Sequence, residues 1–95
     1  MGKFEIFGRD LYDAHHHRIA TARGLAIYNA DNQRVASIRG DELLDSDERI
    51  MATVRGSEIY DADSKKVGSL ADVQESIRGA VAGIVHVAMW YCFVR

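Results

Sequence analysis

LAIYNADNQRVASIRG, residues 25–40, decides the fold, because its pattern of residue types occurs four times in succession without a gap. The four sixteen-residue units are 9–24, 25–40, 41–56 and 57–72. In each unit, two short runs rich in aliphatic, β-branched or aromatic residues flank a polar segment that contains Asp or Asn. Such a segment favours a turn, since Asp and Asn side chains accept hydrogen bonds from backbone N–H groups two residues further on. Each unit is therefore predicted to be a β-hairpin.

Equivalent positions of the four units carry similar residues. The third position holds Leu11, Ile27, Leu43 and Ile59, and the twelfth holds Ala20, Ala36, Ala52 and Gly68. In the second run of each unit, small or aliphatic residues alternate with Thr, Ser and Arg, which is the period of a strand with one face toward a core. Because the twelfth position is always Ala or Gly, we expect another element to approach this face closely.

Glycines are predicted to form sharp bends between one hairpin and the next. Gly24, Gly40 and Gly56 end the first three units, and Gly8 has the same phase ahead of the first. The segment 3–8, KFEIFG, has the phase of a second strand. We expect it to pair beside the last hairpin and close the ring, because an open sheet of short strands exposes edges that invite aggregation.

Residues 73–94 are predicted to form a helix. Asp72 and Glu75 have the spacing of a capping box, with an acceptor at the cap and Glu three residues later. From Ala80 to Val94 the only clearly polar residue is His86, so this helix is expected to be buried in protein or in lipid. Its apolar part spans about 22 Å, short of the roughly 30 Å of a bilayer's hydrocarbon core. Burial in protein, in the channel inside the hairpins, is favoured.

The "IYNAD…VAS" and "IYDAD…VGS" units, followed by the apolar terminal helix, resemble the 4-fold β-flower domain. That family consists of symmetric shallow barrels of repeated hairpins in bacterial proteins of unknown function, and the resemblance covers essentially the whole chain. The expected fold is a single domain over 1–95, mainly β with one α-helix. In it, four sixteen-residue hairpin repeats over 9–72 form a shallow pseudo-four-fold barrel around the buried C-terminal hydrophobic helix 73–94, and 3–8 is the closing strand. The outline is also similar to the tubby-like C-terminal domain, whose lipid-binding residues have no counterpart here.

Composition narrows the classes of protein to consider. The chain is 47% hydrophobic and 27% charged with a formal net charge of -2, which is typical of a soluble globular protein and predicts no overall attraction to nucleic acid. The single cysteine, Cys92, excludes an intramolecular disulfide framework and favours a reducing compartment. The first ten residues lack the apolar stretch of a secretory signal, so a cytoplasmic location is expected.

Three arginines are the candidate binding residues. Arg23, Arg39 and Arg55 share one position in their units, immediately before a predicted bend, and are expected on one rim. Three guanidinium groups there would bind an anionic headgroup, a phosphate or an acidic partner. The favoured interpretation is structural, the alternative to anion binding, since Glu42 and Glu58 follow Arg39 and Arg55 by three residues and would form ion pairs with them, although Arg23 is followed by Ala26 at that spacing.

Other polar clusters are weaker candidates. His15, His16 and His17 form the first predicted turn, which would fix Zn or Ni ligands poorly. The Asp-rich turns lack the glycine and the distant Glu of an EF-hand loop. His86 is expected to be a neutral, hydrogen-bonded core residue. No catalytic triad, Cys/His pair or phosphate-binding glycine loop can be assembled, so no catalytic residue, metal site or cofactor is predicted, and an enzyme is not expected.

The sequence therefore predicts a small non-enzymatic binding or assembly module whose rims contact a protein, a lipid headgroup or another copy of the chain. No nucleic-acid partner is expected. The alternative is a membrane-associated protein anchored by its C-terminal apolar segment, with Gly79 and Gly83 at the spacing that lets helices approach in membranes. In the favoured interpretation, these two glycines instead let strands approach the central helix.

Overall fold

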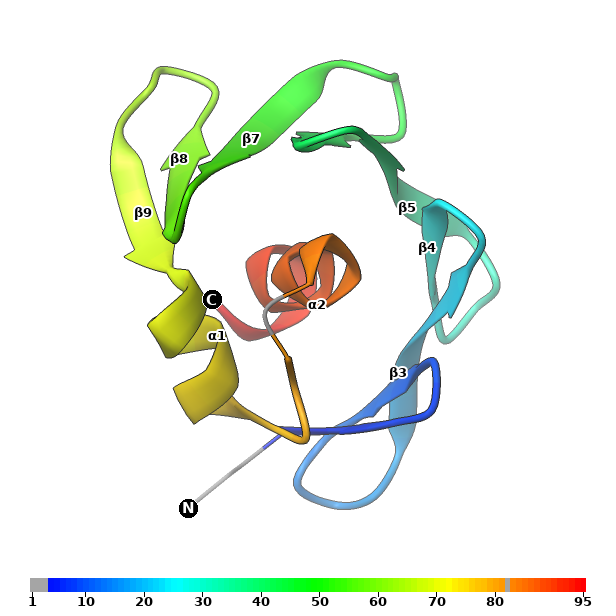
Figure 1. Ribbon diagram of the computed structural model, residues 1–95. Helices are drawn as coiled ribbons and strands as arrows, with labels where there is room; N and C mark the ends of the chain where they lie inside the picture. Colours follow the sequence, from blue (N-terminus) through cyan, green and yellow to red (C-terminus); the bar gives the residue numbers. More distant parts are fainter. Residues whose placement is uncertain (1–3, 82) are drawn as a thin grey trace.

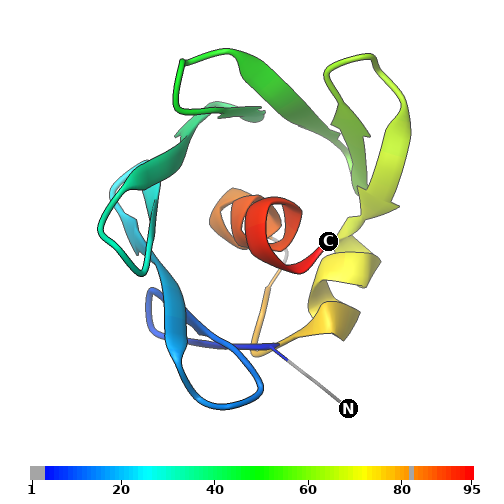
Figure 2. The same ribbon diagram turned by 180° about the vertical axis from the view of Figure 1, so that it is seen from behind.

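The computed structural model describes residues 4–81 and 83–95, and the protein is mainly β. Within these residues, ten strands form one sheet in the order β10-β1-β2-β3-β4-β5-β6-β7-β8-β9. The strands are β1 (Phe4–Phe7), β2 (Asp10–Tyr12), β3 (Arg18–Arg23), β4 (Ala26–Asn29), β5 (Arg34–Arg39), β6 (Glu42–Leu44), β7 (Ile50–Arg55), β8 (Glu58–Asp61), β9 (Lys66–Ser69) and β10 (Ile77–Arg78). The sheet curves around the helix α2 (Ile84–Met89), which continues as a π-helical turn, Trp90–Val94 (Figures 1 and 2).

The sheet is open between β9 and β10, so β1 does not have the predicted pairing. Instead of lying beside the last hairpin, β1 pairs antiparallel with β2 and parallel with β10, where Phe4 is opposite Ile77 and Glu5 is opposite Arg78. The helix α1 (Leu70–Ser76) lies in the gap between β9 and β10 (Figure 1). The prediction for 3–8 was wrong because the chain forms this helix before it returns to the sheet; Lys3 lies outside the described residues.

The predicted continuous helix 73–94 is also wrong. Its first part is α1, whose N-cap is Ser69: the Ser69 hydroxyl accepts a hydrogen bond from the Asp72 N–H, and the Asp72 carboxylate accepts one from the Ser69 N–H at 2.9 Å. The capping box therefore begins three residues earlier than expected. After Ser76 the chain extends into β10, turns at Gly79 with φ +84°, and becomes helical again at Ile84. Ala82, inside the predicted helix, lies outside the described residues.

Tight turns occupy one edge of the sheet. Each has a glycine as the first of two central residues, and in each turn the glycine alone has a positive φ, between 59 and 66°. This is the type II′ geometry, which suits the right-handed twist of paired strands. The glycines are Gly8, Gly24, Gly40 and Gly56. The predicted bends between hairpins are thus hairpin turns themselves, and we call this edge, residues 7–10, 23–26, 39–42 and 55–58, the tight-turn rim.

The opposite edge carries the polar turns that the sequence predicted. In each one, a side-chain oxygen accepts hydrogen bonds from the backbone N–H groups two and four residues further on, at 2.8 to 3.0 Å. The accepting residues are Asp13, Asn29, Asp45 and Asp61. The residue three further on has φ between 64 and 67°. We call this edge, residues 13–17, 29–33, 45–49 and 61–65, the Asx-turn rim.

The core lies between the inner face of the sheet and α2. The third and twelfth positions of each unit face each other across neighbouring strands, and all four third-position side chains are fully buried. The close approach expected on this face is found at Gly68, where an added Cβ would lie 2.5 Å from Cη2 of Trp90. The Trp90 ring therefore fills the space that a methyl group occupies in the other three units.

Candidate functional site

The three candidate arginines all end a strand at the tight-turn rim, as their shared position predicts. Arg23 ends β3, Arg39 ends β5 and Arg55 ends β7. Successive members are two strands apart, which corresponds to about 10 Å along the sheet. They therefore lie on one rim without converging on a single small anion, and each has its own neighbours.

Arg39 adopts the structural alternative. Its guanidinium forms an ion pair with Glu42, with 3.1 Å between Nη2 and Oε1, across the tight turn that follows Arg39. The corresponding pair does not form between Arg55 and Glu58. The Glu58 carboxylate accepts hydrogen bonds from the Tyr60 hydroxyl at 2.7 Å and the Lys66 ammonium at 3.1 Å. Both bonds lower the pKa of Glu58, and the bond from Tyr60 raises the pKa of that phenol.

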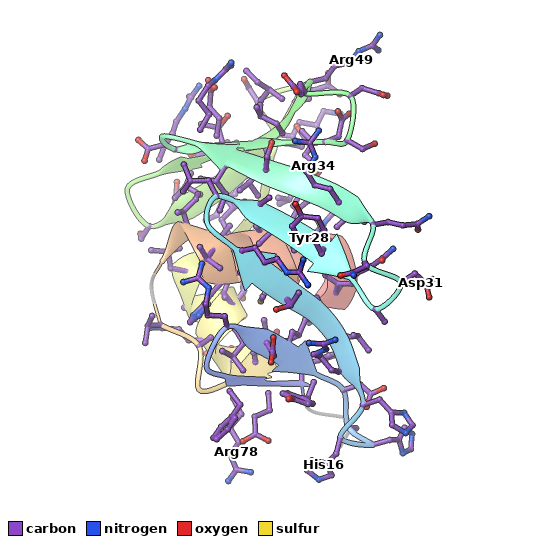
Figure 3. All side chains as sticks on the ribbon, turned by 90° about the vertical axis from the view of Figure 1, so that its right-hand side faces the viewer. His16, Tyr28, Asp31, Arg34, Arg49 and Arg78 are labelled. Carbon is purple, nitrogen blue, oxygen red and sulfur yellow. The ribbon has the colours of Figure 1, made fainter. Side chains whose placement is uncertain are left out.

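Arg23 and Arg55 instead stack on tyrosines of the neighbouring strand. The Arg23 guanidinium carbon lies 5.1 Å from the centre of the Tyr28 ring, and that of Arg55 lies 5.3 Å from the Tyr60 ring. Arg23 also donates a hydrogen bond to the Asn32 side chain at 3.2 Å. Tyr28 lies on the outer face of the sheet (Figure 3), so these arginines are held along the outside of the hairpins. Among the residues that the structure describes, neither guanidinium forms an ion pair with a carboxylate.

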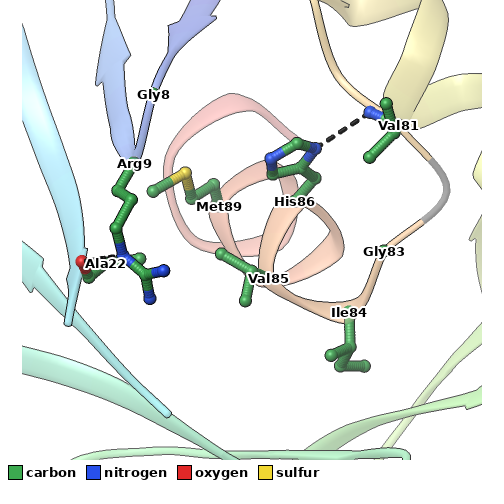
Figure 4. A pocket seen from close by; sticks show the side chains of 9 residues that line it. All are labelled: Gly8, Arg9, Ala22, Val81, Gly83, Ile84, Val85, His86 and Met89. Atoms are coloured by element: carbon green, nitrogen blue, oxygen red, sulfur yellow. Dashed lines mark hydrogen bonds between the residues drawn. The ribbon is translucent and has the colours of Figure 1, made fainter. Parts of the chain in front are cut away.

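A pocket opens between the tight-turn rim and the beginning of α2. It has a volume of about 390 Å³ and lies between the β1–β2 turn, the end of β3 and the first turns of α2 (Figure 4). Most of its wall is apolar and includes Ala22 from β3 and Ile84, Val85 and Met89 from α2. Two polar side chains reach it from different elements, Arg9 and His86.

Arg9 is fixed by backbone carbonyl groups. Its Nε donates to the Ala22 oxygen at 3.0 Å and its Nη2 donates to the Gly24 oxygen at 3.3 Å. Figure 4 shows the side chain extending from the β1–β2 turn to Ala22 of β3. Within residues 4–81 and 83–95, Arg9 forms no ion pair. Its orientation is therefore set by two hydrogen bonds to neutral acceptors, and its charge faces the pocket.

His86 is held in one tautomer. Its Nδ1 accepts a hydrogen bond from the Val81 N–H at 2.9 Å, so the proton of the neutral ring is on Nε2. Burial lowers the pKa of His86, which keeps the ring neutral near pH 7. The sequence predicted a neutral, hydrogen-bonded core residue. The ring is hydrogen-bonded, but it is only partly buried and lines the pocket.

Comparison with protein-family models, with curated proteins and with solved structures gave no significant match. The case for a site at this rim therefore rests on its own residues. Sequence reasoning missed Arg9 and the pocket, although a signal was present. Arg9 stands at the first position of its unit, where the other units have Leu25, Asp41 and Ser57. Ala22 likewise replaces the larger Ile38 at its position. Only Ala22 departs from a repeat pattern, since the first position, which Arg9 occupies, differs in all four units.

The remaining clusters add no second site. The imidazole rings of His15 and His17 have centroids 6.2 Å apart on the Asx-turn rim, and His16 (Figure 3) lines a smaller pocket with Glu5, Phe7 and Tyr12. In the described part of the chain, no three His, Cys, Asp or Glu side chains are placed to hold a metal ion. Burial raises the pKa of Cys92 to about 11, so its thiol is protonated. Over the same residues, neither helix has the length and apolar character needed to span a bilayer.

Proposed function

We propose that this protein is a non-enzymatic binding module of the β-flower kind, in which the tight-turn rim binds the anionic headgroups of a lipid surface. In the proposed architecture, the four sixteen-residue units are equivalent hairpins of a shallow barrel around the C-terminal helix. Supporting this, both kinds of turn recur every sixteen residues with the same backbone geometry. The fit of Trp90 against Gly68 supports a helix that is packed inside the hairpins.

The distribution of exposed apolar side chains carries the proposal. Among the described residues, Phe7 is 75% exposed, Leu25 is 65% exposed and Val81 is 60% exposed. Phe7 and Leu25 flank the glycines of the first two tight turns, and Val81 lines the pocket together with Gly8. Exposed apolar groups gathered on one surface are typical of contact with a membrane or another protein.

The charges favour a lipid surface over a protein partner. The half of the rim formed by the first two tight turns, which we call the β1–β4 half, carries Arg9 beside the exposed apolar groups. Arg23 also belongs to it, with its guanidinium held along the outer face of the hairpin by Tyr28 and Asn32. Its one carboxylate, Asp10, accepts a hydrogen bond from the Thr21 hydroxyl and lies 4.0 Å from Arg18. Guanidinium groups bind phosphate through paired hydrogen bonds, and each basic residue near an anionic membrane contributes about 1 kcal/mol.

The other half of the rim has the opposite character. Its tight turns carry Asp41, Glu42 and Glu58 against Arg39 and Arg55, a formal charge of -1 where the turns of the β1–β4 half carry +1, and no residue of those turns is a large exposed hydrophobic one. We therefore expect the molecule to approach a membrane with the β1–β4 half first. The net charge of -2 makes this attraction local, and salt should weaken it strongly.

Vesicle sedimentation tests the proposal. The full chain should sediment with vesicles of phosphatidylcholine and phosphatidylglycerol, and much less with phosphatidylcholine alone. A variant with Phe7→Ser and Leu25→Ser should lose this binding. The matched control is Ile50→Ser, which removes a 40% exposed hydrophobic residue at the start of β7, beside the Asx-turn rim. Circular dichroism of each variant confirms that it is folded.

Two outcomes would reject the lipid proposal. The first is equal sedimentation with neutral and anionic vesicles, or equal loss of binding in the Ile50→Ser control. The second is a dimer of the wild-type chain in solution that the double serine variant dissociates, which would assign the apolar rim to self-association.

A further inference from the structure

We infer that the pocket between Arg9 and α2 binds a small amphipathic carboxylate, a molecule with one carboxylate group and a short hydrocarbon chain. This goes beyond the proposed function, because a soluble ligand would enter the pocket of the free protein, although the pocket shares Arg9 and Val81 with the surface proposed to contact lipid. The inference rests on the charge, the hydrogen-bond donors and the shape of the pocket.

The charge of the pocket matches a monoanion. Among the described residues that line the pocket, Arg9 alone has a permanent charge and none is Asp or Glu. A guanidinium has five N–H donors, and the two hydrogen bonds to the Ala22 and Gly24 oxygens leave further donors for a ligand. The planar fork suits both oxygens of a carboxylate. A doubly charged phosphate would bring one negative charge more than the single guanidinium balances.

His86 provides a second donor. Because the Val81 N–H occupies Nδ1, the Nε2–H is the donor that remains available to a ligand. Figure 4 shows this second ring nitrogen on the side of His86 that faces Met89 and Arg9. A neutral donor opposite the guanidinium would orient an anionic headgroup without adding a second positive charge.

The apolar part of the pocket exists because Ala22 is small. The fourteenth position of the other units holds Ile38, Val54 and Leu70, whereas the first unit has Ala22, whose own side chain is buried. The space that a larger side chain would fill at this position is bordered by Val85 and Met89 of α2. A volume of about 390 Å³ is at the small end of the range of roughly 300–1,000 Å³ for small-molecule pockets. It suits one short hydrocarbon chain.

Calorimetric titration of the full chain with octanoate, octanol, acetate and octyl phosphate tests the inference. Octanoate should bind more tightly than the other three. Arg9→Gln should weaken octanoate binding by about tenfold, the loss expected for a charge-assisted hydrogen bond, and leave octanol binding unchanged. Arg49→Gln is the matched control, because Arg49 is an exposed arginine on the Asx-turn rim (Figure 3).

A second variant tests the shape of the pocket independently of its charge. Ala22→Ile introduces the side chain that the second unit has at Ile38, and should abolish octanoate binding without lowering the melting temperature. Unchanged octanoate binding in Ala22→Ile would place the ligand elsewhere and overturn the inference. Equal affinity for octanol and octanoate, or tighter binding of octyl phosphate, would overturn the proposed role of Arg9.

The two proposals fail in different experiments. The double variant Phe7→Ser and Leu25→Ser should lose vesicle binding and still bind octanoate, since neither residue lines the pocket. Vesicle binding without octanoate binding would reject the pocket ligand alone. Octanoate binding without vesicle binding would reject only the lipid surface.

Discussion

Gly68→Ala should destabilise the protein, although the other three units carry alanine at this position. The added Cβ would lie 2.5 Å from Cη2, 3.1 Å from Cζ2 and 3.2 Å from Cζ3 of Trp90. Because Trp90 is buried in the core, its ring cannot rotate freely away from the added Cβ, and the helix or the strand must move. Overpacking of this kind costs about 1–3 kcal/mol.

The assay is urea and thermal unfolding followed by far-ultraviolet circular dichroism, which does not depend on the Trp90 fluorescence. For a chain of this size, each kcal/mol lowers the melting temperature by roughly 4–8 °C. Gly83→Ala is the control, since its Cβ would meet nothing closer than 4.0 Å; because Ala is a poorer N-cap than Gly, this change alone should cost roughly 0.5–1 kcal/mol, and the contact with Trp90 predicts a larger loss for Gly68→Ala.

A double-mutant cycle identifies the cause. Trp90→Phe alone should destabilise, because it leaves a void in the core. Combined with Trp90→Phe, the Gly68→Ala change should cost much less than in the wild type, which corresponds to a favourable coupling of about 0.5–3 kcal/mol. Wild-type stability of Gly68→Ala, or additive effects of the two changes, would refute the contact with the central helix.

Three further predictions concern other positions. Gly79→Ala should lower the free energy of unfolding in urea by more than 1 kcal/mol, because Gly79 has φ +84° and an added Cβ would lie 2.9 Å from the Ile6 carbonyl oxygen. Wild-type stability of this variant would argue against the turn at Gly79. Glu48→Gly should stabilise by up to about 1 kcal/mol, since Glu48 has φ 65° and glycine removes the strain, whereas Asp47→Gly, one residue earlier, should not. The pKa of His86 is lower in the folded than in the unfolded chain, so the unfolded state binds more protons and stability should fall as the pH decreases through about 6.5. A fall of the same size in His86→Gln would assign it to other groups.

The hairpins and their turns were predictable because their causes are local. An Asp or Asn at the fifth position of a unit bonds to N–H groups two and four residues away, so Asp45 and Asp61 form the same turn in any surroundings. The tight turn at Gly24 likewise needs only glycine and its neighbours.

The division of the C-terminal segment was not predictable from local sequence. Apolar composition from residue 80 onward indicates burial, but it does not indicate where the chain turns. Gly79 adopts its positive φ beside the Ile6 carbonyl, and Ile6 is far away in sequence. The start of α1 was misplaced because Asp72 was interpreted as the cap, whereas it is the partner of Ser69.

The candidate site was predicted only in part for a related reason. Equivalent positions placed Arg23, Arg39 and Arg55 on one rim, but their partners come from residues that differ between units. Arg39 meets Glu42, and Arg55 meets Tyr60. The pocket exists because Ala22 is opposite α2. It could not be predicted without knowing where α2 lies relative to the sheet.

The parallel pairing of β1 with β10 joins the first and the last strand of the chain at one place in the sheet. Every other strand pairs with its neighbour along the chain, whereas this contact joins Phe4 and Glu5 to residues more than seventy positions later through two residue pairs. Contacts between distant segments carry the largest loop-closure cost, so this one should form last during folding and separate first. Amide hydrogen exchange should therefore be fastest, among the paired strands, at β1 and β10, and slowest in the central hairpins.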